Sequence, residues 1–199
     1  MLLNYHEEHI SLLLNNLQSC HSDVQLMACT YLSRWAIGHP EIVNHELGGA
    51  IRKTLEEIVM VAGEDLSSMR REAIFALGFW GNEESVEILV GLSVGETKSS
   101  DENLRQTCMF ALGVIGGLGA IKTLCQGAEK DETESVRLNA IGGIVHSRFI
   151  AKHSWNVESK ELVELTLRKI SDNLNEKGYL RRIAGNLLKE LRVGGEKGS

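Results

Sequence analysis

The sequence contains little proline and few aromatic residues. Pro40 is the single proline in 199 residues, so nearly the whole chain is free of the residue that breaks helices. Aromatic residues make up 5% of the chain against 43% for all apolar residues, so we expect a core of small and aliphatic side chains. These features predict a single all-α domain.

Long apolar runs and an excess of basic charge are also lacking. No apolar stretch approaches the roughly 18 residues of a membrane span, and the N-terminus lacks the basic and apolar regions of an export signal. The net charge of −6 disfavours binding to phosphate backbones and anionic membranes. We therefore expect a cytoplasmic protein whose partner is neither nucleic acid nor a membrane.

The cysteines do not form a metal-binding pattern. Cys20, Cys29, Cys108 and Cys125 show no CxxC spacing and no nearby pair of histidines. Cys108 stands where other copies of the repeat described below carry alanine, which indicates a small buried residue. We expect reduced structural thiols, no metal site and no cofactor.

A ten-residue pattern recurs along the chain: apolar, Arg, x, x, small, x, x, small, Leu, Gly. It is clearest from Met69 to Gly78 and from Leu104 to Gly113, and weaker copies begin at Val24, Val136 and Leu180. The starts lie 32–45 residues apart, a period typical of stacked helical pairs. The sequence therefore predicts an α-α superhelix, a right-handed solenoid of about five hairpins.

Apolar periodicity and turn residues place the expected helices. The ranges are 5–19, 23–37, 44–62, 67–80, 83–94, 101–115, 118–129, 133–148, 159–175 and 178–192. We expect residues 1–192 to form one domain and residues 193–199, rich in glycine and charge, to form a flexible tail. The stretch around residues 149–156 departs from the period. It either extends the fourth hairpin and caps the stack, or protrudes so that Phe149, Trp155, His146 and His153 contact a partner.

These units resemble HEAT repeats of the short variety named for phycobilisome lyases, with a second helix of the form Val-Arg-x-x-Ala-x-x-Ala-Leu-Gly. The resemblance covers about 22–192, and its arginine position is filled by Arg70, Arg105, Arg137 and Arg181. It implies an armadillo-type solenoid in which each arginine pairs with an acidic residue in the turn of its own or the adjacent repeat. Asp65, Asp101 and Asp131 precede their arginines by four to six residues.

Two copies depart from this repeat. Gln25 replaces the arginine in the first, and Gly143, Ile144 and Val145 replace the second alanine and the Leu-Gly pair in the fourth. A terminal unit needs no partner on one side, which accounts for Gln25. The glycine in the fourth copy allows either a closer approach between helices or a kink.

Enzymatic relatives of the repeat provide tests for chemistry. Deoxyhypusine hydroxylases hold two irons through His-Glu pairs just after the arginine, but the matching pairs here are Arg71-Glu72, Gln106-Thr107 and Leu138-Asn139. The glycines between Gly113 and Gly119 follow a helix and precede no GK[ST], so they do not form a phosphate loop. Catalytic residues are therefore not assigned. The phycobilisome-lyase resemblance leaves attachment or removal of an open-chain tetrapyrrole as an alternative, and HEAT-like alkylpurine DNA glycosylases are a lower one that the acidic charge disfavours.

Helical geometry assigns positions one, five, eight, nine and twelve of the pattern to the interior, which buries Trp35 and Trp80. Positions three, seven and ten point outward, and in HEAT arrays this side of the second helices is concave. The expected partner-binding residues are Leu26, Arg71, Phe75, Gln106, Phe110, Leu138 and Arg182. Phe75 and Phe110 either anchor a partner in this groove or tilt into the seams between repeats.

We expect a non-catalytic protein-binding module: an adaptor, a chaperone-like factor or an inhibitor that covers another protein. Its acidic charge also suits an immunity factor against a basic toxin. The sequence does not identify the partner or the oligomeric state.

Overall fold

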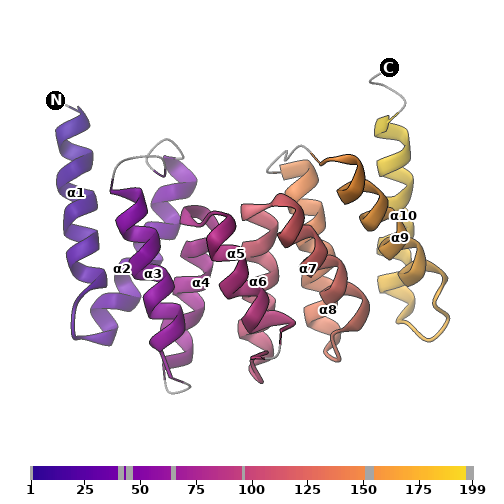
Figure 1. Ribbon diagram of the computed structural model, residues 1–199, viewed down its shortest axis with the longest axis horizontal. Coiled ribbons are helices and arrows are strands. Elements are labelled where there is room, and N and C mark those ends of the chain that lie inside the picture. Colours follow the sequence, from indigo (N-terminus) through magenta and orange to yellow (C-terminus); the bar gives the residue numbers. More distant parts are fainter. Residues whose placement is uncertain are drawn as a thin grey trace.

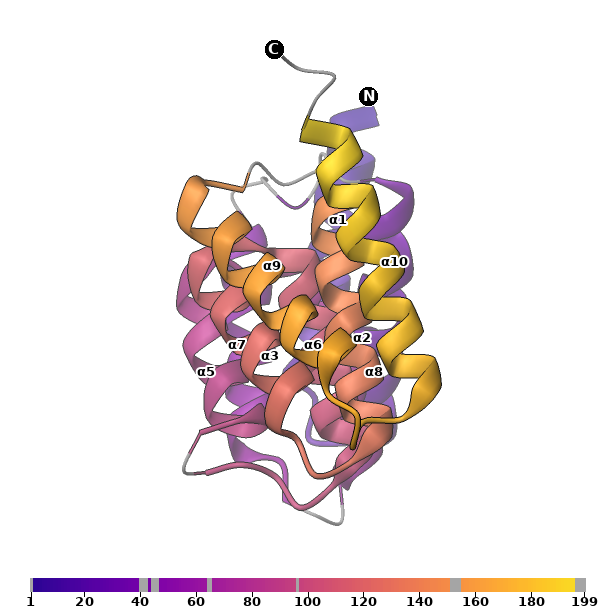
Figure 2. The same ribbon diagram turned by 90° about the vertical axis from the view of Figure 1, so that its right-hand side faces the viewer.

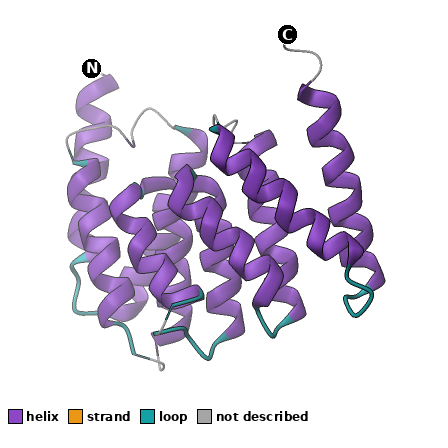
Figure 3. Ribbon diagram, turned by 45° about the vertical axis from the view of Figure 1, so that its right-hand side comes forward, coloured by secondary structure: helices purple, strands orange, loops and turns teal. Residues whose placement is uncertain are grey.

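The computed structural model of the protein describes residues 2–39, 43, 47–63, 66–95, 97–150 and 155–195. Every regular element within these residues is helical (Figure 3). The elements are α1 (Leu2–Leu17), α2 (Ser22–Gly38), α3 (Gly48–Val61), α4 (Ser67–Trp80), α5 (Glu83–Ser93), α6 (Glu102–Ile115), α7 (Gly117–Lys130), α8 (Glu134–Val145), a π-helical turn (His146–Ile150), α9 (Val157–Asp172) and α10 (Gly178–Gly195).

Consecutive helices pair into hairpins that stack in chain order, with α1 and α10 at opposite ends of the stack (Figure 1). The first helices α3, α5, α7 and α9 form one layer, and the second helices α2, α4, α6 and α8 pack side by side in the other (Figure 2). The predicted helical-hairpin solenoid is confirmed. Helix α10 continues to Gly195 and so takes in the first residues of the expected tail; residues 196–199 lie outside the described residues.

Local side-chain hydrogen bonds explain where several helices begin. The Asp101 carboxylate accepts from the backbone N–H groups of Asn103 and Leu104 and caps α6. Asn82 and Ser85 form a reciprocal capping box at the start of α5. At Gly116, α6 ends and α7 follows at once, with φ of 74° at Gly116 and 82° at Gly117, a backbone that glycine adopts without strain.

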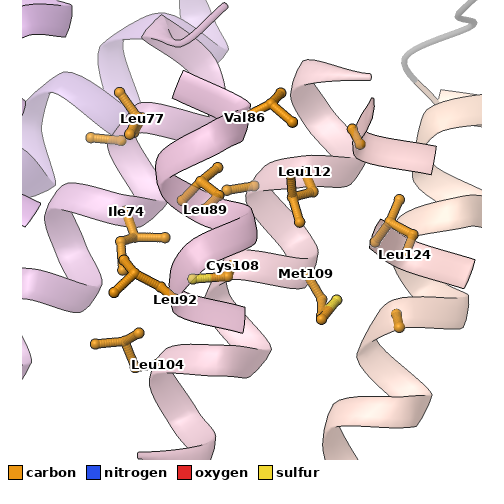
Figure 4. Close-up of a cluster of buried hydrophobic side chains, with 14 of the residues drawn as sticks. Ile74, Leu77, Val86, Leu89, Leu92, Leu104, Cys108, Met109, Leu112 and Leu124 are labelled. Carbon is orange, nitrogen blue, oxygen red and sulfur yellow. The ribbon is translucent and has the colours of Figure 1, made fainter. Parts of the chain in front are cut away.

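Small and aliphatic side chains fill the space between the two layers, as the composition predicts. In the middle of the stack, Ile74 and Leu77 of α4 meet Leu89 of α5, and Cys108 and Leu112 lie on α6 beside them (Figure 4). All of these side chains are fully buried. The core is therefore continuous from one hairpin to the next, and this continuity holds the array together.

Close backbone contacts join neighbouring second helices. A Cβ atom added to Gly78 would lie 3.0 Å from Cα of Ala111, and one added to Gly113 would lie 2.6 Å from Cα of Gly143. In these two copies position ten of the pattern therefore lies in the seam between second helices and not on the outer surface. The expectation for this position was wrong here because α4 and α6 each pack against a second helix on both sides as well as against their hairpin partner. The glycine of the fourth copy serves close approach.

The two tryptophans of the pattern differ in burial. Trp80 is 2% exposed, and its indole Nε1 donates to the Leu32 carbonyl oxygen at 3.1 Å, which links α4 to α2. Trp35 is only partly buried and lies edge-on to the rings of His9 and His39. The prediction of a buried residue therefore holds fully for Trp80 and in part for Trp35, which lies at the end of the stack, where no earlier hairpin covers it in the described chain.

The repeated arginines stabilise their hairpins through backbone carbonyls. In α4, α6, α8 and α10 a guanidinium N–H donates to one or two carbonyl oxygens in the preceding helix or turn. The pairs are Arg70 with Val59, Arg105 with Ser99 and Ser100, Arg137 with Asp131 and Glu132, and Arg181 with Ser171.

Arg105 also forms a buried ion pair with the next hairpin. Its Nε and Nη2 atoms each lie 3.0 Å from a carboxylate oxygen of Asp131, and the two side chains are 2% and 1% exposed. Burial acts to lower the pKa of Arg105, but the hydrogen bonds and charge of Asp131 outweigh this effect and raise the pKa. Arg137 makes the equivalent bond to Glu176 at 2.9 Å. The ladder thus connects successive repeats.

Of the two arrangements that the resemblance allows, the ion pairs of Arg105 and Arg137 use an acidic residue of the adjacent repeat. Asp101 caps its own helix instead of pairing with Arg105, and the Asp131 carboxylate serves the arginine of the preceding repeat. Arg105 can pair with Asp131 because its long side chain extends past the turn of its own hairpin to the turn of the next hairpin. Asp65 lies outside the described residues.

The described part of the irregular segment after α8 packs against the fold mainly through Trp155. The chain continues from α8 into the π-helical turn, and Trp155, 8% exposed, donates from its Nε1 to the buried Ser147 Oγ at 3.1 Å. Arg148 lies 5.8 Å from the Trp155 ring centroid. Phe149 remains 42% exposed, whereas His153 lies outside the described residues. Trp155 therefore packs into the fold and does not protrude toward a partner.

Candidate functional site

A groove of about 650 Å³ crosses the layer of second helices from α2 to α8. Its lining residues repeat at the same places in successive helices: the residue just before the ten-residue pattern and positions three, four and seven. They are Leu26, Thr30, Ser68, Arg71, Glu72, Phe75, Asn103, Gln106, Thr107, Phe110 and Asn139. This i, i+3, i+4, i+7 spacing forms one face of a helix, so each second helix contributes one stripe to the groove.

Stacked aromatic rings form one part of the groove wall. The rings of Phe75 and Phe110 lie 4.9 Å apart at 18° to each other, across the seam between α4 and α6. Phe79 meets Phe75 edge-on at 5.5 Å, and His146 meets Phe110 at 5.4 Å. Phe75 and Phe110 are both half-buried. The rings therefore pack against each other across the seam, as the second alternative predicts, and they also line the groove.

Amide and hydroxyl groups form the α6–α8 part of the wall. The Gln106 amide donates to Ser135 Oγ at 3.0 Å, and its oxygen accepts from Asn139 Nδ2 at 3.3 Å. Asn139 Nδ2 also donates to the Ser135 carbonyl oxygen at 2.9 Å. These bonds hold the amides in fixed orientations, with further donor and acceptor capacity at the groove surface.

The charged residues of the groove are neighbours on α4. Glu72 turns toward α2, where its carboxylate accepts from Thr30 Oγ1 at 3.4 Å. Arg71 Nη2 lies 3.5 Å from Ser68 Oγ, at the outer limit of a hydrogen bond. Arg71 as a whole is partly exposed and lines the groove.

Five of the seven expected partner-binding residues line this groove: Leu26, Arg71, Phe75, Gln106 and Phe110. Leu138, 37% exposed on α8, and Arg182, exposed on α10, are not among the lining residues. Thr30 occupies position seven, which was expected to face outward, although Thr30 was not among the seven. Sequence reasoning missed Ser68, Glu72, Asn103, Thr107 and Asn139. The i, i+3, i+4, i+7 period could have identified them, because they occupy the position before the pattern and position four.

The three buried thiols do not provide a nucleophile, whereas Cys20 is exposed and lies outside the groove lining. Burial raises the pKa of Cys29 and of Cys108 to about 12 and that of Cys125 to about 11. The charge of Glu72 adds to the rise at Cys29. At neutral pH these thiols are protonated and buried. Within the described residues there is also no group of three His, Cys, Asp or Glu side chains placed to hold a metal ion.

The stacked hairpins, their arginine ladder and the groove of the second helices agree with one comparison. Residues 55–145, from within α3 to the end of α8, match the family model described as HEAT repeats. This matched stretch, somewhat less than half of the chain, is similar to HEAT repeats. The matched stretch contains the central hairpins, with the aromatic stack and most of the groove. A search of curated proteins finds no match to this chain. None of the described helices has the length and apolar character required to cross a membrane.

Proposed function

We propose that this HEAT-repeat protein is a non-catalytic binding module that holds a segment of another protein in the groove of its second helices. Adaptors, chaperone-like factors and inhibitors or immunity factors belong to this class. HEAT repeats generally mediate contacts between proteins. The observation that carries the proposal is the half-buried Phe75–Phe110 stack, set in a groove whose other lining residues, apart from Leu26, are polar or charged.

The mixed character of the lining suits a polypeptide. Aromatic side chains supply large contact area at little cost in conformational entropy, and such residues carry much of the energy of protein interfaces. The amides of Asn103, Gln106 and Asn139 offer both donors and acceptors, as the main chain of a bound segment requires. The groove therefore has an apolar anchor site beside groups that satisfy a peptide backbone.

Blocking the groove tests the proposal. Thr107→Trp places a large ring on the groove wall, while Glu161→Trp adds the same ring to the exposed face of α9. Each variant is expressed in the native cell and purified, and the proteins bound to it are quantified against the wild type. A stoichiometric partner is expected to remain with Glu161→Trp and to be lost with Thr107→Trp.

Phe110→Asp gives a second test, because it introduces a charge into the aromatic stack. Circular dichroism establishes that each variant is folded before its partner is measured. If the folded variants with an altered groove keep the partner at wild-type stoichiometry, the proposed site is wrong.

The bilin-lyase alternative gives a different expectation. Incubation with an open-chain tetrapyrrole and a phycobiliprotein subunit would produce a covalent, zinc-fluorescent adduct if the protein were such a lyase. A binding module yields no such product. Retention on DNA that decreases with salt would likewise indicate the nucleic-acid alternative.

A further inference from the structure

We propose that the groove selects a segment in which an acidic side chain and an aromatic or aliphatic side chain lie two residues apart, the acid on Arg71 and the apolar group on the Phe75–Phe110 stack. This inference rests on the proposed function and specifies the chemistry of the bound segment. It commits to an internal stretch of a partner protein.

The positive charge of Arg71 is the first argument. Gln106 occupies position three in the next repeat, and its amide forms two hydrogen bonds across the seam to α8. Arg71 occupies the same position on α4, but among the described residues its side chain makes one hydrogen bond, the 3.5 Å approach to Ser68 of its own helix. A guanidinium has five N–H donors in a planar fork that matches a carboxylate. The groove therefore presents donors suited to an anion at this point.

The neighbouring Glu72 does not cancel this preference. Its carboxylate is directed across the other seam toward Thr30 of α2. Position three faces the following helix and position four the preceding one, as the bonds of Gln106 and Asn139 show. The two charges of α4 thus lie on different sides of the helix stripe, with the guanidinium on the side of α6.

The spacing between the charge and the rings sets the spacing in the ligand. Arg71 and Phe75 are one helical turn apart on the same face of α4, with about 5–6 Å between their Cβ atoms. In an extended peptide, residues i and i+2 point to the same side and lie about 6.5 Å apart along the chain. An acidic residue at i and an apolar residue at i+2, or the reverse order, therefore reach both sites together.

The shape of the groove favours an internal segment, which passes along the groove, rather than the end of a chain. The groove is lined by four helices in succession, so it continues on both sides of the Arg71–Phe75 pair. Asn103, Gln106 and Asn139 lie along this course and can bond to the peptide main chain.

Peptide display with random linear sequences tests the inference. Both ends of each peptide are joined to the scaffold, so that no terminal carboxylate is present. The purified wild-type protein is expected to enrich Asp or Glu two residues from an aromatic or aliphatic residue. Arg71→Glu should reverse the charge preference at that position to Lys or Arg, and should weaken binding of a wild-type-selected peptide by at least about tenfold. Arg168→Glu, on the exposed face of α9, carries the same charge change and should leave selection unaltered.

The outcomes separate this inference from the function on which it rests. In one outcome, Phe110→Ala or Thr107→Trp abolishes the enrichment, but wild type and Arg71→Glu show the same acidic preference. This result overturns the acid–apolar inference and leaves the groove as the binding site. Enrichment that none of the folded groove variants changes overturns the proposed function as well. If the wild type enriches no peptide, both are wrong. If it selects only peptides with a free C-terminal carboxylate in a parallel library, the internal segment is refuted.

Discussion

Replacing Arg105 by methionine tests the arginine ladder, because the change removes a charge that is almost wholly buried. The guanidinium bonds to both oxygens of Asp131, to Glu132 and Thr133, and to two carbonyl oxygens of its own turn. The variant leaves the Asp131 carboxylate buried without its main partner. Breaking a buried ion pair in this way costs about 3–5 kcal/mol. This is a large share of a domain stability of about 5–15 kcal/mol.

An exposed ion pair provides the matched control. Lys122 and Glu158 join α7 to α9 at 2.8 Å, but their side chains are 54% and 57% exposed. Solvent screens such a pair, so Lys122→Met is expected to cost at most about 1 kcal/mol.

Urea denaturation followed by circular dichroism measures both effects. The double variant Arg105→Met/Asp131→Leu should lose less free energy of unfolding than the sum of its single variants, since no unpaired buried charge remains. The reasoning is refuted if Arg105→Met costs no more than Lys122→Met, or if the single losses simply add.

Three further predictions concern thiols, acid and seams. Cys20, which is exposed, should react with a thiol reagent at pH 8 in the native protein, while the other cysteines should react only after denaturation; rapid native labelling of all four would contradict their burial. Burial acts to raise the pKa of Glu176, but hydrogen bonds from Arg137 and the backbone outweigh this effect and hold the pKa below its usual 4.5. The ionised carboxylate therefore stabilises the fold above pH 4.5, and this stabilisation is lost as the pH falls through the lowered pKa. In thermal unfolding, Glu176→Gln should thus lose less stability than the wild type between pH 7 and pH 3. Gly113→Ala should cost about 1–3 kcal/mol, because its Cβ would meet backbone at 2.6 Å, whereas Gly142→Ala, with open space around it, should be neutral or stabilising by urea denaturation.

The architecture could be predicted from the sequence because it depends on local repetition. Each copy of the pattern carries its own apolar stripe, and the copies at Met69 and Leu104 fall on α4 and α6. Helix termini follow from local residues too, as the Asp101 cap illustrates. These features involve residues that are close in the chain, so one sequence contains them.

The contacts between repeats were harder to predict, because they depend on how the hairpins stack. Arg105 pairs with Asp131 in the turn of the next hairpin, and its separation from the nearby acidic residues in the sequence does not determine which of them becomes its partner. Likewise, the helical wheel assigned Gly113 to the outer face, but the neighbouring α8 covers it. The wheel gives the angle of a side chain around its helix, whereas the positions of the neighbouring helices decide which angles face solvent.

The groove was predicted in part for the same reason. Phe75 and Phe110 were identified from their repeated position, but their contact across the seam depends on the distance between α4 and α6. Thr107 and Asn139 were missed, since position four was not assigned to the concave face. A stripe at i, i+3, i+4, i+7 is the better description of the surface that each second helix presents.

Photocrosslinking from single positions is the most direct test of the claim that the groove of the second helices binds a protein segment. A photoreactive amino acid is placed at Thr107, on the groove wall, or at Glu161, on the exposed face of α9, and the cells are irradiated. The account predicts a discrete covalent adduct with one partner protein from position 107 and none from position 161. An adduct from position 161 alone, with none from position 107, would contradict it.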